Sequence, residues 1–241
     1  MSDSAAHRNL LGQRVGAPVP GWSPRSLPPR TAMAGRFCTV KPLDPARHAA
    51  QLFAAYAEDR EGRMWTYLPR GPYASLDEYG SWAEAACQTD DPLVHAILDN
   101  TTGEAVGTAS YMRIEPNVGV IEIGSITYSP RLQRRPAATE AMYLMMRRVF
   151  DELGYRRYEW KCDSLNQPSR DAAARLGFRY EGLFRQASIT RGGNRDTTWF
   201  SVIDSEWPAL RAAFEGWLDP ANFTADGTQR RSLASLRSSA G

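Results

Sequence analysis

The chain has few of the residues on which several common enzyme classes depend. Its 241 residues include three histidines, and these are His7, His48 and His95. The sequence contains no Gly-x-Ser-x-Gly elbow, no Walker loop and no cluster of metal-ligating residues. These absences argue against a Ser-His-Asp hydrolase, a P-loop enzyme and a metal enzyme, and we expect no bound metal.

Cysteine is equally scarce, and the spacing of the cysteines supports neither a disulfide framework nor a zinc site. The three cysteines are an odd number without a C-x-x-C pair, and they are Cys38, Cys87 and Cys162. This usage fits a reducing cytoplasm, which is the expected location. No apolar run approaches about 18 residues and no signal peptide is recognisable, so we expect no association with a membrane.

Net charge is also close to zero, at +2. The positive charge is concentrated between Arg131 and Arg135 and near the C-terminus, at Arg230, Arg231 and Arg237. No extended basic face follows from this distribution, so nucleic acid is not an expected partner.

Composition divides the chain into one domain and two terminal segments. Residues 1–33 are rich in proline with little apolar periodicity, which predicts an arm that is poorly ordered or lies on the surface. Residues 34–223 carry the periodic patterns of one domain of ordinary size. Residues 224–241 are rich in serine and arginine without aromatics, which predicts a disordered tail.

Apolar spacing predicts the order of elements in the first half of the domain. We expect a strand near 36–43, a helix over 45–58 and a second helix that begins after Ser75 and reaches Cys87. Three strands should follow as a meander, near 94–98, 105–114 and 118–127.

The segment 121–140 is the most informative, because an apolar strand passes through a basic turn directly into a helix. Pro136 suits the first helical turn, and the helix should run to about residue 153. The first amides of a helix lack intrahelical partners and carry partial positive charge, so the turn predicts an anion site. The alternative is that its arginines form only a solvated cap.

The next segment continues the alternation of strands and helices. Tyr158 and Trp160 alternate with charged residues, which predicts a strand. Asn166 and Ser169 open a short helix, and Gly177 closes it. The order strand, helix, strand, helix, strand therefore follows.

This order resembles the GNAT N-acetyltransferases, most closely their RimJ/RimL-like branch, over about residues 36–207. The resemblance is carried by Gln-Arg-Arg-Pro-Ala-Ala at 133–138, Ala-Thr-Glu-Ala at 138–141, Asn-Gln-Pro-Ser at 166–169, and Leu-Gly-Phe at 176–178 before Glu-Gly at 181–182. It implies an α/β (α+β) fold with a mixed, mostly antiparallel sheet flanked by helices. That sheet should be splayed at the strand before the coenzyme-binding helix.

The resemblance also implies acetyl-CoA as cosubstrate, with its pyrophosphate on the basic turn. Gln133 and Ala138 match the family's loop, whereas Pro136 stands where glycine is usual and removes a backbone donor. Phosphate binding should then rely more on neighbouring amides and arginines. The residues expected to bind coenzyme are Ile126, Thr127, Tyr128, Arg131, Gln133, Arg134, Arg135, Pro136, Ala137, Ala138, Thr139, Asn166 and Ser169.

Three residues are candidates for catalysis. The match to the family's motif implies that Ser169 protonates the departing thiolate and Asn166 positions the pantetheine arm; both residues could instead only cap a helix. Glu122 projects away from Ile121 and Ile123, and a carboxylate among apolar neighbours would have a raised pKa suited to a general base. Asp196 is the second candidate base, and the alternative for both carboxylates is a structural role.

The loop 63–73 is dense in aromatic residues. In the family it faces the acceptor, which implies that Trp65, Tyr67 and Tyr73 form a wall. Arg60 and Arg63 lie beside the loop and could hold an acidic or phosphorylated part of an acceptor, or could only be solvated. The aromatic side chains could instead only cover the helix pair.

These features predict an acetyl-CoA-dependent N-acetyltransferase that transfers directly in a ternary complex to a primary amine. We expect a small-molecule acceptor, such as an amine metabolite, an antibiotic or an aminoacyl nucleotide, because no peptide groove is evident. A protein N-terminus, as in ribosomal-protein acetylation, is the first alternative. A non-catalytic acyl-CoA sensor is the second, and a monomer and a homodimer both stay open.

Overall fold

The computed structural model describes residues 7–239, and residues 1–6 of the predicted arm and 240–241 of the predicted tail lie outside it. One eight-stranded sheet organises the chain in the order β1-β2-β3-β4-β5-β6-β8-β7. All neighbouring strands are antiparallel except β5 and β6. The strands are β1 (Met33–Ala34), β2 (Cys38–Pro42), β3 (Leu93–Asp99), β4 (Ala105–Glu115), β5 (Val120–Tyr128), β6 (Arg157–Asp163), β7 (Arg179–Thr190) and β8 (Gly193–Ile203). The mixed, mostly antiparallel sheet predicted from the resemblance is confirmed.

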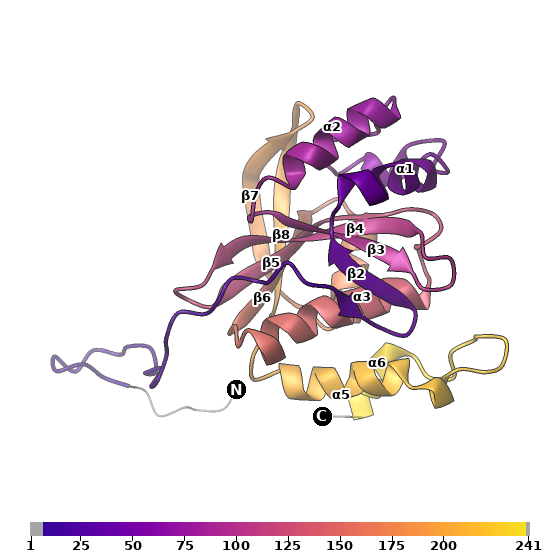
Figure 1. Cartoon of the computed structure of the whole chain (residues 1–241). Helices are drawn as coiled ribbons and strands as arrows, with labels where there is room; N and C mark the ends of the chain where they lie inside the picture. The colour runs from indigo at the N-terminus through magenta and orange to yellow at the C-terminus, as the bar shows by residue number, and fades with distance from the viewer. Residues whose placement is uncertain (1–6, 240–241) are drawn as a thin grey trace.

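Helices cover both faces of this sheet. On one face lie α1 (Pro45–Tyr56) and α2 (Leu76–Ala86), and across the other runs α3 (Pro136–Arg147), which a π-helical turn extends over Arg148–Glu152. Beyond α3 lie α5 (Trp207–Leu218) and α6 (Leu233–Ser239) (Figure 1). The remaining elements are α4 (Gln167–Leu176) and the short 3₁₀ turns η1 (Arg63–Trp65) and η3 (Pro220–Asn222).

Local signals in the sequence explain where several helices begin and end. The Ser75 hydroxyl accepts a hydrogen bond from the Glu78 amide at 3.2 Å, and α2 starts directly after it. At the other end of α4, Gly177 has φ of 100°, a conformation that costs little only for glycine. Both predicted boundaries are confirmed.

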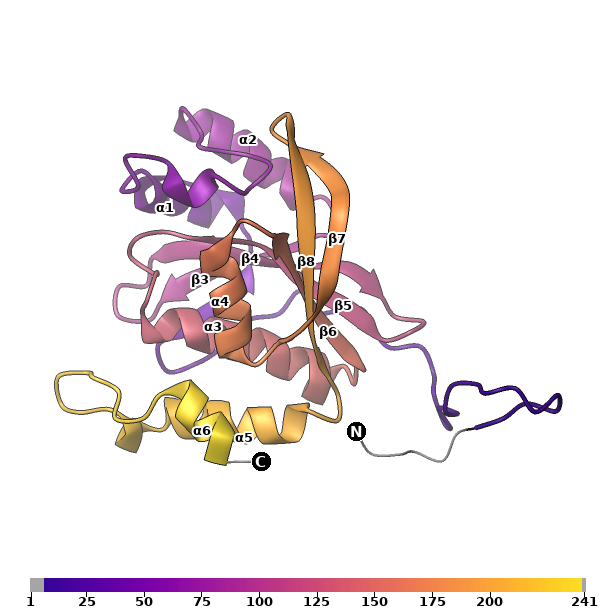
Figure 2. The same ribbon diagram turned by 180° about the vertical axis from the view of Figure 1, so that it is seen from behind.

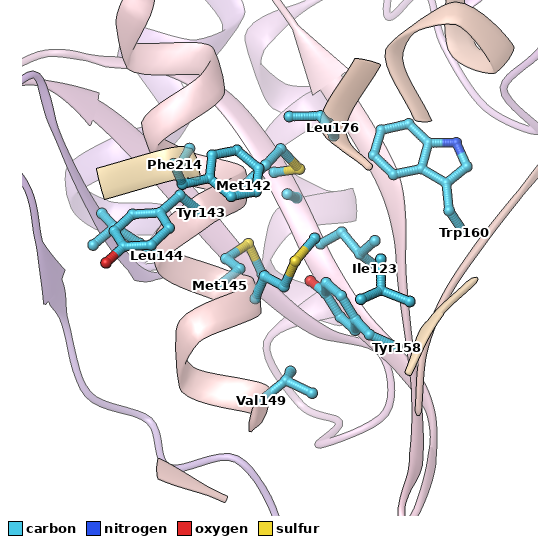
Figure 3. Packing of buried hydrophobic residues seen from close by; sticks show 14 of the residues in the cluster. Ile123, Met142, Tyr143, Leu144, Met145, Val149, Tyr158, Trp160, Leu176 and Phe214 are labelled. Carbon is cyan, nitrogen blue, oxygen red and sulfur yellow. The ribbon is translucent and has the colours of Figure 1, made fainter. Parts of the chain in front are cut away.

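The core lies on both faces of the sheet, and its larger part is under α3. Ile123 of β5 and Tyr158 and Trp160 of β6 face Met142 and other apolar side chains of α3 (Figure 3). Strand alternation then directs Glu122 and Glu159 to the opposite face. One face of these two strands is therefore apolar, and the other is charged.

A buried carboxylate holds α3 against the edge of the sheet. Glu140 accepts hydrogen bonds from the amides of Arg36, Phe37 and Cys38 at 2.7, 2.6 and 2.8 Å. Three backbone donors satisfy the buried charge, which would otherwise be costly. A Cβ at Gly35 would lie 2.4 Å from the carboxyl carbon, so only glycine fits this turn. This contact sets the position of the helix that carries the predicted anion site.

The central strands separate as the resemblance implies. β5 and β6 pair only from Val120–Arg157 to Ile123–Trp160, after which β6 continues along β8 while β5 stays with β4. On β5, Ser125 and Ile126 lie opposite the single residue Ala109, and Ser125 has φ of 49°. A bulge of this kind bends a strand, and here it does so where β6 departs.

The prediction of a disordered C-terminal tail is wrong for the described part. Residues 233–239 form α6, where Leu233 is only 2% exposed and Leu236 packs on the core. The Arg237 guanidinium donates to the carbonyl groups of Ala174 and Arg175, at the C-terminal end of α4, over 2.7 and 3.1 Å. Two leucines and one arginine of this segment contact the domain. The polar composition of the segment as a whole did not indicate these contacts.

The N-terminal arm follows two courses. From Trp22 onward it lies on the domain, where the Trp22 indole donates to the Asn117 carbonyl at 2.8 Å and the Tyr155 hydroxyl donates to Ser26 at 3.2 Å. Residues 7–20 project away from the domain (Figures 1 and 2). No helix within residues 7–239 is long and apolar enough to cross a membrane.

Docking of α6 can be tested by removing its buried side chain. Leu233→Ala should lower Tm by roughly 4–10 °C, because a core leucine truncation costs at least about 2 kcal/mol. Val118→Ala, at an exposed position, is the control and should leave Tm nearly unchanged. Equal melting of both variants would mean that α6 does not contribute to stability.

Candidate active site

The turn between β5 and α3 is preorganised by its own backbone. The Ser129 carbonyl accepts from the amides of Leu132 and Gln133 at 2.9 and 3.0 Å. The Gln133 side chain donates to the Tyr128 carbonyl at 2.8 Å, while Leu132 is buried in the core. Gln133 thus closes the turn, and the start of α3 is held directly beyond the splayed end of β5.

The start of α3 has the properties of an anion site. Within the described residues, the amides of Arg134 and Ala137 have no acceptor, and no side chain caps the helix. Arg134 and Arg135 are exposed and make no ion pair with any residue from 7 to 239. Pro136 removes one donor at the first helical position, but the neighbouring amides and the helix dipole remain. These groups fit a pyrophosphate.

Arg131 does not belong to this group, contrary to the prediction from sequence. Its guanidinium pairs with Glu58 after α1 at 2.7 Å and with Glu104 before β4 at 2.8 Å. Both carboxylates are distant in sequence, so no local pattern could reveal them. Arg131 joins the loops that carry these two carboxylates. Its charge is neutralised there and is not free at the turn before α3.

Ser169 lies at the first turn of α4, on the β6 side of the splay. Its hydroxyl oxygen accepts from the Trp160 indole at 3.0 Å. Indole nitrogen is only a donor, so the hydroxyl hydrogen of Ser169 remains available to another acceptor. The Asn166 side chain accepts from the Ser169 amide at 3.2 Å and caps the helix. The capping alternative therefore describes Asn166, whereas the hydroxyl of Ser169 is not used as a cap.

Glu122 is buried as predicted, but its surroundings are not apolar. Its carboxylate lies 2.6 Å from an Arg113 nitrogen and 2.9 Å from the Lys161 ammonium. Lys161 also pairs with Glu159 at 2.7 Å and lies 3.7 Å from the centre of the Trp199 ring. The expectation of a carboxylate among apolar neighbours is wrong, because β4 and β6 supply cations to the same face.

Asp196, the second predicted base, has a structural part in the β7–β8 hairpin. It accepts from the Gln186 amide at 2.7 Å and from the Asn194 side chain at 2.9 Å. These hydrogen bonds, the Gln186 amide first, lower the pKa of Asp196. A lowered pKa makes it a poorer proton acceptor. Its contacts instead stabilise the bulge of β7 at Gln186, where φ is 51°.

The aromatic loop packs between α1, α2 and the end of β5. Trp65 is buried with its ring edge-on to Tyr56 and Tyr73, at 5.3 and 5.6 Å between centroids. Tyr67 reaches across to the β6–α4 loop, where its hydroxyl donates to the Leu165 carbonyl at 3.0 Å. Trp65 and Tyr73 are among the residues that line one small pocket. Tyr67 instead links the aromatic loop to the loop between β6 and α4.

Arg63, the candidate acceptor residue from the sequence, does not line this pocket, whereas Arg70 does. Arg63 is exposed and pairs with Glu61, whereas Arg70 extends over the Trp82 ring, 4.5 Å from its centre. The pocket's lining also includes Thr127, which the sequence placed with the coenzyme, and four residues that were not predicted, namely Tyr56, Tyr79, Trp82 and Thr108. In the sequence, the aromatic residues of α1 and α2 have only the spacing of buried helical positions, so they did not indicate a pocket.

Thr127 connects the pocket to the splayed strand. The Tyr56 hydroxyl lies 3.3 Å from the Thr108 hydroxyl and 3.4 Å from the Thr127 carbonyl. The same end of β5 therefore borders the aromatic pocket on one side and continues into the turn before α3 on the other. Within residues 7–239, no three His, Cys, Asp or Glu side chains are grouped to hold a metal ion.

A splayed sheet, a preformed anion turn and an adjoining pocket define the acetyl-CoA-dependent acyltransferase class. Residues 38–179 match the family model for the acetyltransferase (GNAT) domain. This match covers more than half of the chain, and the protein belongs to the GNAT family, as the resemblance predicted.

Solved structures agree with this membership. A GNAT N-acetyltransferase from Brucella melitensis is 48% identical with a TM-score of 0.89, and the match covers 91% of this chain and all of that one. A GNAT-family protein from Chromobacterium violaceum is 37% identical, with a TM-score of 0.76 and coverage of 81% and 98%. No curated protein matched the chain.

A more distant structure shares the fold alone. It is an acetyl transferase from Salmonella typhimurium that modifies the N-terminal serine of a 50S ribosomal subunit protein. It is 20% identical, with a TM-score of 0.62 and coverage of 71% of this chain and 98% of that one.

Charge reversal tests the anion turn. Arg134→Glu and Arg135→Glu should each weaken acetyl-CoA binding about tenfold to a hundredfold in calorimetry at low salt, because each removes a charge-assisted contact. Arg14→Glu in the projecting arm makes the same change in net charge and should bind normally. Unchanged affinity in both single variants and their double variant would remove these side chains from the site.

Proposed function

We propose that this protein transfers an acetyl group from acetyl-CoA directly to the primary amine of a small molecule. The observation that carries the proposal is the tightly packed aromatic lining beside Thr127, at the free end of β5. An acceptor side that is narrow and aromatic suits a small chemical group better than an extended peptide.

Contacts on the acceptor side support a small substrate. Tyr67 ties the aromatic loop to the β6–α4 loop, and Arg191 of the β7–β8 turn donates to the carbonyl groups of Leu68 and Arg70 at 2.9 and 3.0 Å. The loop is thereby held from two sides. A fixed loop restricts the shape of an acceptor and lowers the ordering cost of binding it.

Several groups of the chain have assigned roles in this proposal. The α3 amides with Arg134 and Arg135 hold the pyrophosphate, and the backbone of β5 beyond Ile123 faces the thioester, since no strand pairs with it on that side. When bound, acetyl-CoA supplies the activated acetyl group. Ser169 donates its free hydroxyl hydrogen to the departing sulfur and regains a proton from the solvent, which receives the proton of the amine.

The roles of Glu122 and Asn166 follow from their contacts. One oxygen of Glu122, Oε2, lies between cations from β4 and β6, so Glu122 is better suited to holding these strands together than to accepting a substrate proton. The amine then loses its proton to solvent water. Asn166 fixes the first turn of α4 and through it the backbone of Ser169.

The acceptor class is tested by a screen with purified full-length protein and acetyl-CoA. Thiol release should be faster with small primary amines than with peptides that carry a free N-terminal serine. Preference for the peptides would replace this proposal with N-terminal acetylation. Coenzyme binding by calorimetry without turnover of any amine would instead indicate an acyl-CoA sensor.

The role of Ser169 is tested on the best acceptor from that screen. Ser169→Ala should lower kcat by about 10²–10⁴ with little change in acetyl-CoA affinity, because the proton donor acts in the transition state. Trp160→Phe keeps the ring but removes the indole donor, so it should lower kcat less. Near-normal kcat in Ser169→Ala would exclude the proton-donor role.

A further inference from the structure

The N-terminal arm carries a closed turn with two leucines at its tip. The Asn9 side-chain oxygen accepts from the amides of Leu11 and Gln13, both at 3.0 Å, and the Asn9 side-chain nitrogen donates to the Gln13 side chain at 2.8 Å. Leu10 and Leu11 lie in this turn and are 106% and 82% exposed. Single exposed leucines are common, but two adjacent ones that bury almost nothing form an apolar surface. We call Leu10 and Leu11 the arm tip.

The arm tip is held away from its own domain. Pro18 and Pro20 favour extended backbone in the residues before them, so this part of the arm is a stiff spacer. Gly21 has φ of 71° at the point where the arm leaves the domain. Among the described residues, 7–20 form hydrogen bonds only with one another and with Trp22. The arm tip therefore has no binding surface on its own domain.

An exposed apolar strand lies on the same side of the molecule as the arm. β7 is the last strand of the sheet, and both the arm and β7 lie on the left in Figure 1 and on the right in Figure 2. Tyr180, Leu183 and Phe184 of β7 are 56%, 44% and 54% exposed. A long apolar edge strand pairs readily with other chains, and proteins usually shorten, charge or cover such an edge. This side of the molecule thus presents two apolar surfaces without a cover.

We propose that two copies of this chain associate on this side and exchange their arms, so that the arm tip of each copy packs on the β7 strand of the other. A reciprocal exchange uses the same two surfaces twice. The contact therefore closes at two copies and leaves neither an arm tip nor a β7 edge uncovered. A single unrelated partner would have to cover two separate surfaces instead.

The size of the arm agrees with such an exchange. The chain between Leu11 and Gly21 can span up to roughly 35 Å when extended, which is about the diameter of a small domain. Each copy would contribute residues 7–20 together with the β7 surface that receives the other arm. These two parts approach the roughly 20–30 residues a side of a standard stable interface. The arm is thus long enough to reach the second copy and large enough to hold it.

The mass of the full-length protein in solution tests the proposal. Light scattering should give twice the chain mass of 26.8 kDa. Leu10→Asp combined with Leu11→Asp should weaken the dimer about a hundredfold or more in sedimentation over a dilution series, because each dimer loses four buried leucines. Leu183→Asp on the receiving strand should also weaken it. Leu76→Asp, at an exposed leucine that begins α2, is the matched control and should leave the dimer intact.

Cross-linking between two different chains shows where the arm tip lies. A Leu11→Cys chain is co-expressed with a tagged Leu183→Cys chain, and a short bismaleimide should join one chain of each kind. Replacing the second chain by Leu76→Cys should abolish that product. A cross-link that forms only within a single chain carrying both Leu11→Cys and Leu183→Cys would mean that the arm docks on its own domain.

Three results would overturn the exchange of arms. They are a monomeric full-length protein, a dimer unchanged by the double substitution in the arm tip, and cross-linking confined to one chain. All substituted side chains are exposed, so melting curves at low protein concentration should show that each variant is folded, whereas the Tm of the dimer should rise with concentration. None of these measurements requires acetyl transfer, so the outcome is independent of the proposed function.

Discussion

The arrangement of the site depends on one buried ion cluster between β5 and β6. Lys161 lies between Glu122 and Glu159, at 2.9 and 2.7 Å, and its side chain and theirs are at least nine-tenths buried. Charges so deeply buried are tolerated only when each has a partner, and removal of one partner leaves a costly unpaired charge. Trp160, the last β6 residue that pairs with β5, directly precedes Lys161. The cluster therefore joins the two strands where they begin to separate.

This separation brings two features of the candidate site to one strand end. The bulge at Ser125 turns the end of β5 away from β6, which leaves one edge of β5 without a pairing strand and leads the chain into the turn before α3. On the other side, Thr127 borders the aromatic pocket. One stretch of backbone thus adjoins both features, and this is the arrangement that the proposed direct transfer requires.

The residues that line the aromatic pocket show why sequence reasoning was incomplete. The aromatic loop was identified as a substrate element, and Trp65 and Tyr73 do line the pocket. Arg63 and Arg70 look alike in the sequence, but only Arg70 lies over an aromatic ring while Arg63 pairs with its neighbour Glu61. The backbone of the loop at Arg70 is also held by Arg191, more than a hundred residues away, and no local pattern could reveal this contact.

The sequence by itself determined the features that depend on neighbouring residues. Strand alternation placed Ile123 in the core, Gly177 ended α4, and the order of strand, basic turn and helix predicted the anion site, because these signals act within a few residues. Only the tertiary structure decided which charged side chains stay free. Arg131 is neutralised by carboxylates from two loops and Glu122 is surrounded by cations from adjacent strands, since the partner of a charge is set by proximity in space and not along the chain.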